Sequence, residues 1–357
     1  MRARLRVLVV DDSPTIREFL ADWIAGQPDM YVVATAGDGE EAVRKARETR
    51  PDVVTMDVNM PQMDGLRATR IIMHECPVPI VVVSGVPGDR ETATFRALEA
   101  GALAFVRRPP GPQDPMHAAG VAELVQTVRL MAEVRVVRRR ATPEAGPGVP
   151  FVPPTLVAAR PHVIRVVVIG ASTGGPVAIR ELLAALPTDF SAPILLVQHM
   201  PAGFVDGFVR WLGETTGHIV EVAADGARLA PGHVYVAPDG CHLGLDASRR
   251  AALSDAAPEH GSRPSVSCLF RAARETIRGE AAAILLSGMG KDGAQELLRL
   301  KEAGAVTFAQ SRDSAAVFGM PGEAVRLEAA SFVLPPAQIG AALAALVQRK
   351  SPRPRPV

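Results

Sequence analysis

The sequence has 357 residues, which is enough for two domains of ordinary size. Hydrophobic residues make up 48% of it and aromatic residues only 4%, a balance typical of α/β proteins with aliphatic cores and not of aromatic-rich β-sandwiches. The formal net charge is +1, so bulk charge gives no reason to expect a nucleic-acid partner or an anionic membrane surface.

Membrane insertion is not expected, because no apolar run reaches the roughly 18 residues that a spanning helix needs. The first apolar run stops at Asp11 and Asp12 and is too short for a secretory signal. The three cysteines, Cys76, Cys241 and Cys268, are spaced neither as a disulfide framework nor as a metal site. These features predict a cytoplasmic protein.

Strands alternate with helices over the first part of the chain. Expected strands cover residues 5–10, 31–36, 52–58, 79–85 and 102–108, and expected helices cover 14–25, 40–48, 65–74 and 90–100. This alternation is typical of βαβ units and predicts a parallel, doubly wound sheet of the flavodoxin type over residues 1–125.

The residues at the carboxyl ends of these strands have charged or hydroxyl side chains that could bind a ligand. Strand ends of a parallel sheet share one edge, where ligands of this fold class bind. Asp11 and Asp12 end the first strand, Asp57 the third, and Ser84 the fourth, while Arg107 and Arg108 end the fifth. Three carboxylates at one edge repel each other unless a cation lies among them, and their hard oxygen atoms suit Mg²⁺.

Residues 126–162 are expected to form a linker, since prolines recur through this part of the chain. A helix with a basic end is expected at residues 121–139. The basic end suits a solvated helix terminus, although contact with an acidic partner is the alternative.

A second α/β region is expected over residues 163–347, followed by a disordered tail at 348–357. Its expected strands cover residues 163–170, 192–199, 233–238, 281–288, 305–310 and 331–335, and a helix follows most of them. The pattern predicts a second parallel, doubly wound sheet of the Rossmann type.

The stretch VVVIGASTGGP at residues 167–177 is a strand that enters a glycine turn. Such a turn either holds a phosphate group or presents Ser172 as a nucleophile. The spacing of Gly170, Gly174 and Gly175 differs from G-x-G-x-x-G, and no acidic residue ends the next strand to hold a ribose. A dinucleotide site is therefore disfavoured.

A nucleophilic serine needs a base and a group that orients the base. His199 ends the strand after APILLVQ, and Asp292 follows the strand AAAILLSG in a glycine-rich turn. His199 alone fits a structural role as well as a catalytic one, but three such residues at three strand ends favour catalysis. The backbone amide at Met289, in the same turn as Asp292, is a candidate oxyanion donor.

The first region resembles the receiver domain of two-component response regulators, through DDS, MDVNMPQMDG, Ser84 and FVRRP. The resemblance implies that Asp57 accepts a phosphoryl group from a histidine kinase and that Asp12, Asp57 and the backbone of Asn59 hold Mg²⁺. Asp11 would assist through water, and Ser84 would act as a switch residue. Arg108 departs from the lysine that is usual in the family.

The second region resembles the catalytic domain of the chemotaxis protein-glutamate methylesterases. The motifs that carry this resemblance are GASTGGP, QHMP, APDGCHL, RPSVSCLF, LLSGMGKDGA and AQSRDSAAVFGMPGEAV. It implies that Ser172 is the nucleophile, His199 the base and Asp292 the orienting carboxylate, with Met289 as oxyanion donor and no cofactor. Ser267 stands where the family usually has aspartate, and its place outside the triad predicts an effect on site shape or substrate approach.

Together the resemblances imply a phosphorylation-regulated hydrolase that demethylates glutamate γ-methyl esters on chemoreceptor helices and deamidates glutamines. Its partners would be a chemotaxis histidine kinase and methyl-accepting chemoreceptors. Three alternatives stay open: a response regulator with a non-catalytic, partner-binding output domain, a general small-molecule esterase, and a dinucleotide-dependent enzyme.

Overall fold

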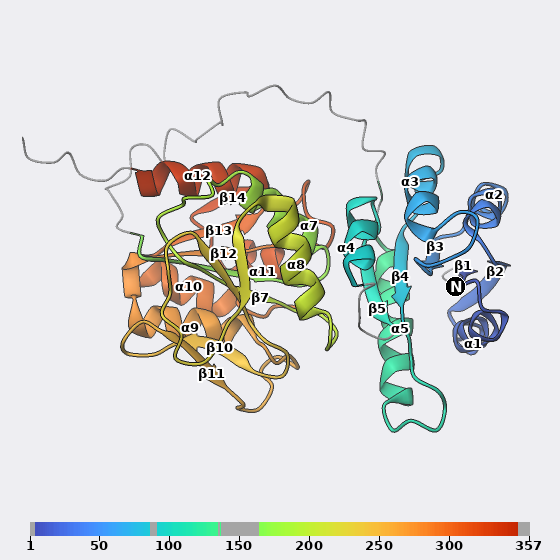
Figure 1. Ribbon diagram of the computed structural model, residues 1–357, viewed down its shortest axis with the longest axis horizontal. Coiled ribbons are helices and arrows are strands. Elements are labelled where there is room, and N and C mark those ends of the chain that lie inside the picture. The colour runs from blue at the N-terminus through green and yellow to red at the C-terminus, as the bar shows by residue number, and fades with distance from the viewer. Residues whose placement is uncertain (1–3, 86–90, 135, 137–163, 349–357) are drawn as a thin grey trace, which may run out of the picture. The chain divides into compact units, whose positions relative to one another are not determined.

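The computed structural model describes residues 4–85, 91–134, 136 and 164–348 (Figure 1). The chain divides into two compact units at residue 146. This division falls within the expected linker at 126–162, most of which lies outside the described residues, as do residues 349–357 of the expected tail.

The first unit is a five-stranded parallel sheet with the strand order β2-β1-β3-β4-β5. Its strands are β1 (Leu5–Val10), β2 (Met30–Ala36), β3 (Val53–Met56), β4 (Ile80–Ser84) and β5 (Ala104–Arg107), and its helices are α1 (Pro14–Ala25), α2 (Gly39–Thr49), α3 (Gly65–Glu75), α4 (Glu91–Glu99) and α5 (His117–Ala132). The predicted doubly wound fold is confirmed. Every residue of β3 is buried, as a central strand covered by helices on both faces requires.

Short polar side chains determine where the first three helices begin. Ser13, Asp38 and Asp64 are the N-cap residues of α1, α2 and α3, and each side chain accepts a hydrogen bond from a backbone amide of the first turn. Such caps satisfy amides that have no partner within the helix. They hold the connections that leave the carboxyl ends of the neighbouring strands.

The helix expected at residues 121–139 is α5, and its bounds differ from that expectation. It begins at His117 and ends at Ala132, and it packs against β3, β4 and β5. Its buried side chains Leu124, Val125, Val128 and Met131 recur at helical spacing and face the sheet. The helix is therefore part of the first unit, and burial of this stripe decides its extent.

The second unit is a seven-stranded parallel sheet with the order β14-β13-β12-β6-β7-β9-β8. The strands of this unit are β6 (Val166–Ala171), β7 (Ile194–Gln198), β8 (Ile219–Val222), β9 (His233–Val236), β10 (His242–Leu245), β11 (Ala251–Ser254), β12 (Ala281–Leu285), β13 (Val306–Gln310) and β14 (Phe332–Leu334). Its helices are α7 (Gly175–Ala184), α8 (Val205–Thr216), α9 (Val266–Thr276), α10 (Ala294–Glu302), α11 (Met320–Arg326) and α12 (Pro336–Gln348), with a 3₁₀ turn η1 (Arg278–Glu280). The second predicted parallel α/β fold is also confirmed.

The chain leaves β6 toward β7 and leaves β12 toward β13, in opposite directions across the sheet. The carboxyl ends of β6 and β12 therefore flank the point where the strand order reverses. Open α/β sheets bind their ligands at such a point. Ser172 follows β6 directly, and the turn with Asp292 follows β12.

Three strands of this unit are not predicted by the sequence pattern. Strand β8 is a four-residue edge strand, and β10 and β11 form a separate antiparallel hairpin. Strand β11 reads AALS, without a β-branched or aromatic residue, so local composition does not mark it. The hairpin is formed by packing instead, because Leu243, Leu245 and Ala251 share a buried cluster with Leu269 and Phe270 of α9.

No helix among the described residues is long and apolar enough to cross a membrane.

Candidate functional site

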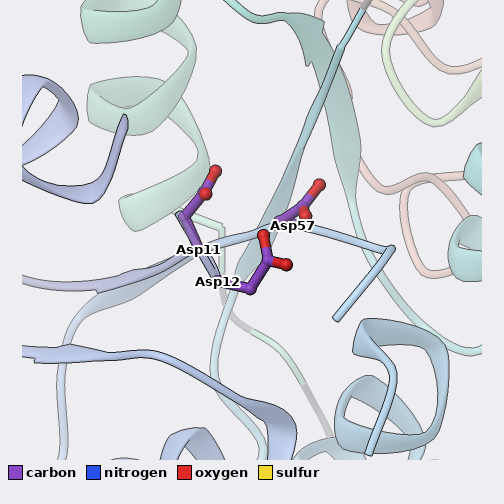
Figure 2. A group of neighbouring side chains, drawn as sticks. All are labelled: Asp11, Asp12 and Asp57. Carbon is purple, nitrogen blue, oxygen red and sulfur yellow. The ribbon is translucent and has the colours of Figure 1, made fainter. Parts of the chain in front are cut away.

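An acidic cluster lies at the carboxyl edge of the first sheet (Figure 2). Asp11 and Asp12 follow β1, and Asp57 follows the adjacent β3. One carboxylate oxygen from each lies within 4.8 Å of the others. Asp11 and Asp57 are buried, whereas Asp12 is exposed. The cluster thus has two fixed carboxylates and one that reaches solvent.

Charge is unbalanced in this cluster. Burial, together with the negative charge of Asp11, raises the pKa of Asp57 to about 6, although Arg108 opposes both effects. Burial likewise raises the pKa of Asp11, again against Arg108. Nη2 of Arg108 lies 3.0 Å from Oδ2 of Asp11 and 3.5 Å from Oδ1 of Asp57. The Arg108 guanidinium therefore contacts two of the three carboxylates, and the hard oxygen donors of the cluster fit a divalent cation such as Mg²⁺.

In the second unit, Ser172, His199 and Asp292 follow the neighbouring strands β6, β7 and β12. The backbone ladder continues past the strand ends: the Ser172 amide donates to the Ser287 carbonyl at 2.9 Å, and the His199 amide donates to the Ala171 carbonyl at 3.0 Å. The three residues expected at one edge are therefore brought to that edge by the register of adjacent strands.

His199 and Asp292 are in direct contact. Nε2 of His199 lies 3.0 Å from Oδ2 of Asp292, and the aspartate side chain is almost fully buried. Burial alone would raise the pKa of Asp292, but hydrogen bonds from His199 and Ser267 and the charge of His199 hold that pKa well below its usual range. The carboxylate is anionic at neutral pH, so Nε2 of His199 carries the proton and Nδ1 is the nitrogen left to act as a base.

Ser172 lies in the turn before α7 and is half-buried. Among the described residues its hydroxyl has no hydrogen-bond partner, so the oxygen is not committed to another group. Gln198 connects it to the base through the backbone, because Nε2 of Gln198 donates to the carbonyls of Ser172 (2.8 Å) and His199 (2.7 Å). Gly175 makes room for this amide, since a Cβ there would lie 2.1 Å from Oε1 of Gln198.

The turn after β12 passes close to Ser172. A Cβ on Gly288 would lie 2.8 Å from Cβ of Ser172. The Gly288 carbonyl accepts hydrogen bonds from the amides of Gly319 and Met320, and within the described chain the Met289 amide has no acceptor. A free backbone amide beside the serine can bind an oxyanion.

Two family models match this chain: a response regulator receiver domain at residues 7–119 and a CheB methylesterase at residues 167–343. A protein-glutamate methylesterase/protein-glutamine glutaminase from Geobacter metallireducens is 48% identical over 351 residues, covering 97% of this chain and all of that protein. A relative of the same name from Nitrosospira multiformis is 49% identical over 348 residues, covering 97% of this chain and 98% of its own. The chain belongs to this family.

The crystal structure of the CheB methylesterase catalytic domain from Thermotoga maritima covers 52% of this chain and 99% of its own, with a TM-score of 0.50 and 37% sequence identity. The second unit is thus a methylesterase domain and the first a receiver domain, and the chain is a response regulator with a hydrolase domain.

In the receiver domain, Ser84 is the last residue of β4 and Asn59 is an exposed residue two positions after Asp57. The Ser84 hydroxyl accepts a hydrogen bond from Oγ1 of Thr94 at 3.2 Å, and its carbonyl accepts one from the Arg108 amide at 2.7 Å. Thr94 is buried on α4. The sequence does not predict its contact with Ser84, because Thr94 lies in a helix and not at the end of a strand.

In the methylesterase domain, the role expected for Ser267 is corrected. Its hydroxyl donates to Oδ1 of Asp292 at 2.6 Å, and its amide donates to the same atom at 2.9 Å. Ser267 therefore contacts the aspartate of the site directly. Ser265 and the amide of Val266 also bind this carboxylate. Sequence reasoning missed these two residues, and it missed the contact of Ser267 with Asp292, because α9 follows a loop and no strand of the sheet.

Proposed function

We propose that Ser172, His199 and Asp292 hydrolyse glutamate γ-methyl esters on the cytoplasmic helices of methyl-accepting chemoreceptors. The observation that carries this proposal is the 3.0 Å contact between His199 and the buried carboxylate of Asp292, at the strand end next to Ser172. The named relatives act on protein glutamate esters and protein glutamine, which supports the same substrates here.

The reaction follows from the free atoms of the site. Nδ1 of His199 takes the proton from the Ser172 hydroxyl as Oγ bonds to the ester carbonyl carbon. The carbonyl oxygen becomes negative and accepts a hydrogen bond from the Met289 amide. When the intermediate collapses, the C–O bond to the methoxy group breaks and methanol leaves with the proton from His199.

Water completes the cycle. His199 takes a proton from water, the hydroxide oxygen bonds to the acyl carbon, and Ser172 leaves with the proton, so that glutamate is released. A glutamine side chain passes through the same steps with ammonia as the leaving group. Asp292 stays anionic throughout and stabilises the protonated histidine, a role for which its lowered pKa suits it. The methylesterase domain needs no cofactor for these steps.

In the receiver domain we infer that Asp57 accepts the phosphoryl group of a histidine kinase. Asp11, Asp12, Asp57 and the carbonyl of Asn59 are the oxygen donors that would hold Mg²⁺, which supplies positive charge beside the transferred group. A carboxylate oxygen of Asp57 bonds to phosphorus as the bond to the kinase histidine breaks. Ser84 and Arg108 then contact the phosphoryl oxygens, and the added charge raises the activity of the methylesterase domain.

This proposal places the protein in the cytoplasm, with a chemotaxis kinase and chemoreceptors as partners. Receptor membranes carrying labelled methyl esters test it directly. The wild type should release labelled methanol, Ser172→Ala should release none, and a small-molecule phosphodonor should raise the wild-type rate but not that of Asp57→Asn. Release that survives Ser172→Ala contradicts the mechanism, and equal rates with and without the phosphodonor contradict the regulation.

A non-catalytic output domain is the main alternative. It gives no reason for a buried carboxylate to hold the histidine beside an uncommitted serine, so the geometry favours hydrolysis. A general esterase is distinguished by substrate: comparable kcat/KM on a soluble methyl ester and on receptor membranes would favour it.

A further inference from the structure

The start of helix α9 surrounds the catalytic carboxylate. Ser265 is the N-cap residue of this helix, and Val266 and Ser267 form its first turn. The amides of Val266 and Ser267 donate to Oδ2 and Oδ1 of Asp292, at 2.7 and 2.9 Å. The hydroxyls of Ser265 and Ser267 both donate to Oδ1, at 3.0 and 2.6 Å. Three consecutive residues thus supply four hydrogen bonds to one carboxylate.

Backbone amides orient both hydroxyls. A serine hydroxyl has one proton, so an amide that donates to its oxygen leaves the proton free to point elsewhere. Oγ of Ser267 accepts from the Gly293 amide at 2.9 Å, and Oγ of Ser265 accepts from the Ser267 amide at 3.2 Å. Both protons are therefore directed at Asp292, and the 2.6 Å bond from Ser267 has the length of a charge-assisted hydrogen bond.

The two oxygens of Asp292 are divided between two tasks. Oδ1 accepts three hydrogen bonds from Ser265 and Ser267 and has no capacity left for the histidine. Oδ2 accepts one amide hydrogen and faces Nε2 of His199. The serines therefore decide which oxygen meets the base.

We propose that Ser267 is a positioning residue, whose hydroxyl keeps Asp292 anionic, turns Oδ2 toward His199 and limits how strongly the carboxylate retains the protonated histidine. This inference rests on the proposed role of the triad. The consequence is that the rate of ester hydrolysis stays high at a lower pH than it would if no serine hydroxyl donated to Asp292.

The sign of the effect follows from electrostatics. Each hydrogen bond to the carboxylate draws negative charge away from Oδ2, so the protonated form of His199 is held less strongly. His199 must be neutral to take the proton of Ser172. When the Ser267 hydroxyl is removed, more negative charge faces the ring, and a higher pH is needed before the base is neutral.

The test measures kcat/KM for methanol release against pH, with full-length protein and methyl-labelled receptor membranes. In Ser267→Ala, the pH at which kcat/KM reaches half its plateau should rise by about half a unit or more. This shift corresponds to a fraction of the free energy of one charge-assisted hydrogen bond, because only part of the charge that the bond neutralises on Asp292 acts on the His199 ring. The rate at which a fluorophosphonate labels Ser172 should show the same shift, which excludes effects of pH on the membranes.

Ser287→Ala is the matched control. Ser287 is also a buried hydroxyl at a strand end next to Ser172, but it donates to the carbonyl of Thr173 and accepts from the amide of Val317. This substitution should lower the rate without moving the half-plateau pH. If Ser267→Ala does not fold, Ser265→Ala takes its place, because it removes another proton from the same oxygen.

An unchanged half-plateau pH in Ser267→Ala, or an equal shift in Ser287→Ala, overturns the inference and leaves Ser267 a purely structural residue. Failure of the triad itself is recognised separately. It would appear as wild-type methanol release or fluorophosphonate labelling that does not depend on Ser172.

Discussion

Nε2 of His199 lies 3.0 Å from Oδ2 of Asp292, and this contact leaves Nδ1 as the ring nitrogen available to act as a base. Replacing Asp292 by asparagine should reverse the tautomer. With its oxygen held by Ser265 and Ser267, the asparagine presents its NH₂ group to the ring, so Nε2 must accept and Nδ1 must carry the proton. A protonated Nδ1 cannot take the proton of Ser172.

We therefore expect Asp292→Asn to lower kcat for methanol release by about 10³- to 10⁴-fold with little change in KM, as for other triads whose carboxylate is made neutral. Steady-state kinetics on receptor membranes measure both constants. Denaturant unfolding of the methylesterase domain in the same variant serves as the control for folding and should stay cooperative, as in the wild type. A loss of less than tenfold would show that the histidine does not depend on this carboxylate.

The grouping of the proposed triad could be predicted from sequence because each of its residues follows a strand, directly or in the turn after it. Ser172, His199 and Asp292 follow apolar runs that read clearly as strands, and parallel strands meet at one edge. Asp11, Asp12 and Asp57 could be grouped for the same reason. Local pattern and topology suffice for residues of this kind.

The residues that hold the triad in place could not be predicted in that way. Ser265 and Ser267 reach Asp292 only because α9 packs on the sheet, and nothing in RPSVS says which carboxylate its helix start will meet. The role of Gln198 has no sequence signal either, because its side chain bonds to the backbone carbonyls of Ser172 and His199. These contacts depend on packing between distant segments, which periodicity does not describe.

The raised pKa of Asp57 predicts how stability of the receiver domain depends on pH. Burial and the charge of Asp11 raise this pKa from 3.8 to about 6, so the charged form is less favourable in the folded state than in the unfolded chain. Below about pH 4 the side chain is protonated in both states and nothing is lost. Between about pH 4 and 6 the unfolded chain loses its proton while the folded state keeps it, so stability falls by on the order of 3 kcal/mol over this range and no further above it.

Asp57→Asn removes this penalty. Without divalent cations it should raise the free energy of unfolding of the receiver domain at pH 8, and the gain should shrink as pH falls toward 4. Denaturant unfolding at several pH values measures it. Asp12→Asn is the control, because its carboxylate is exposed and should change stability far less. A gain that persists at pH 4 would trace the effect to something other than the charge of Asp57.

Arg108 is expected to compete with a bound cation. Its guanidinium lies against Asp11 and Asp57 and offsets part of their charge. Arg108→Ala should therefore increase the affinity for Mg²⁺ at pH 8 by about threefold to tenfold, since a guanidinium so close repels the ion by about 1 kcal/mol even in a well-screened site.

Titration calorimetry of Mg²⁺ into the full-length protein tests this expectation. Arg107→Ala is the matched control, because Arg107 is the neighbouring residue at the end of β5 and its side chain is exposed. Weaker Mg²⁺ binding in Arg108→Ala than in Arg107→Ala would mean that the guanidinium organises the carboxylates more than it competes with the ion.

The close packing of Gly175 against Gln198 links the helix start of α7 to catalysis. A Cβ at position 175 would lie 2.1 Å from Oε1 of Gln198, so Gly175→Ala must move this amide, which holds the carbonyls of Ser172 and His199. We expect methanol release to fall at least tenfold and unfolding to become easier by about 1–3 kcal/mol, the range seen for overpacked cores. Phosphorylation of Asp57 should persist, because the receiver domain is a separate compact unit.

Gly213→Ala, in the interior of α8, is the control: its Cβ would come no closer than 3.5 Å to a neighbouring atom. That substitution should stabilise the methylesterase domain by about 0.5–1 kcal/mol through the better helix propensity of alanine, with activity unchanged. If both alanines leave methanol release intact, the Gln198 amide does not set the position of the two catalytic residues.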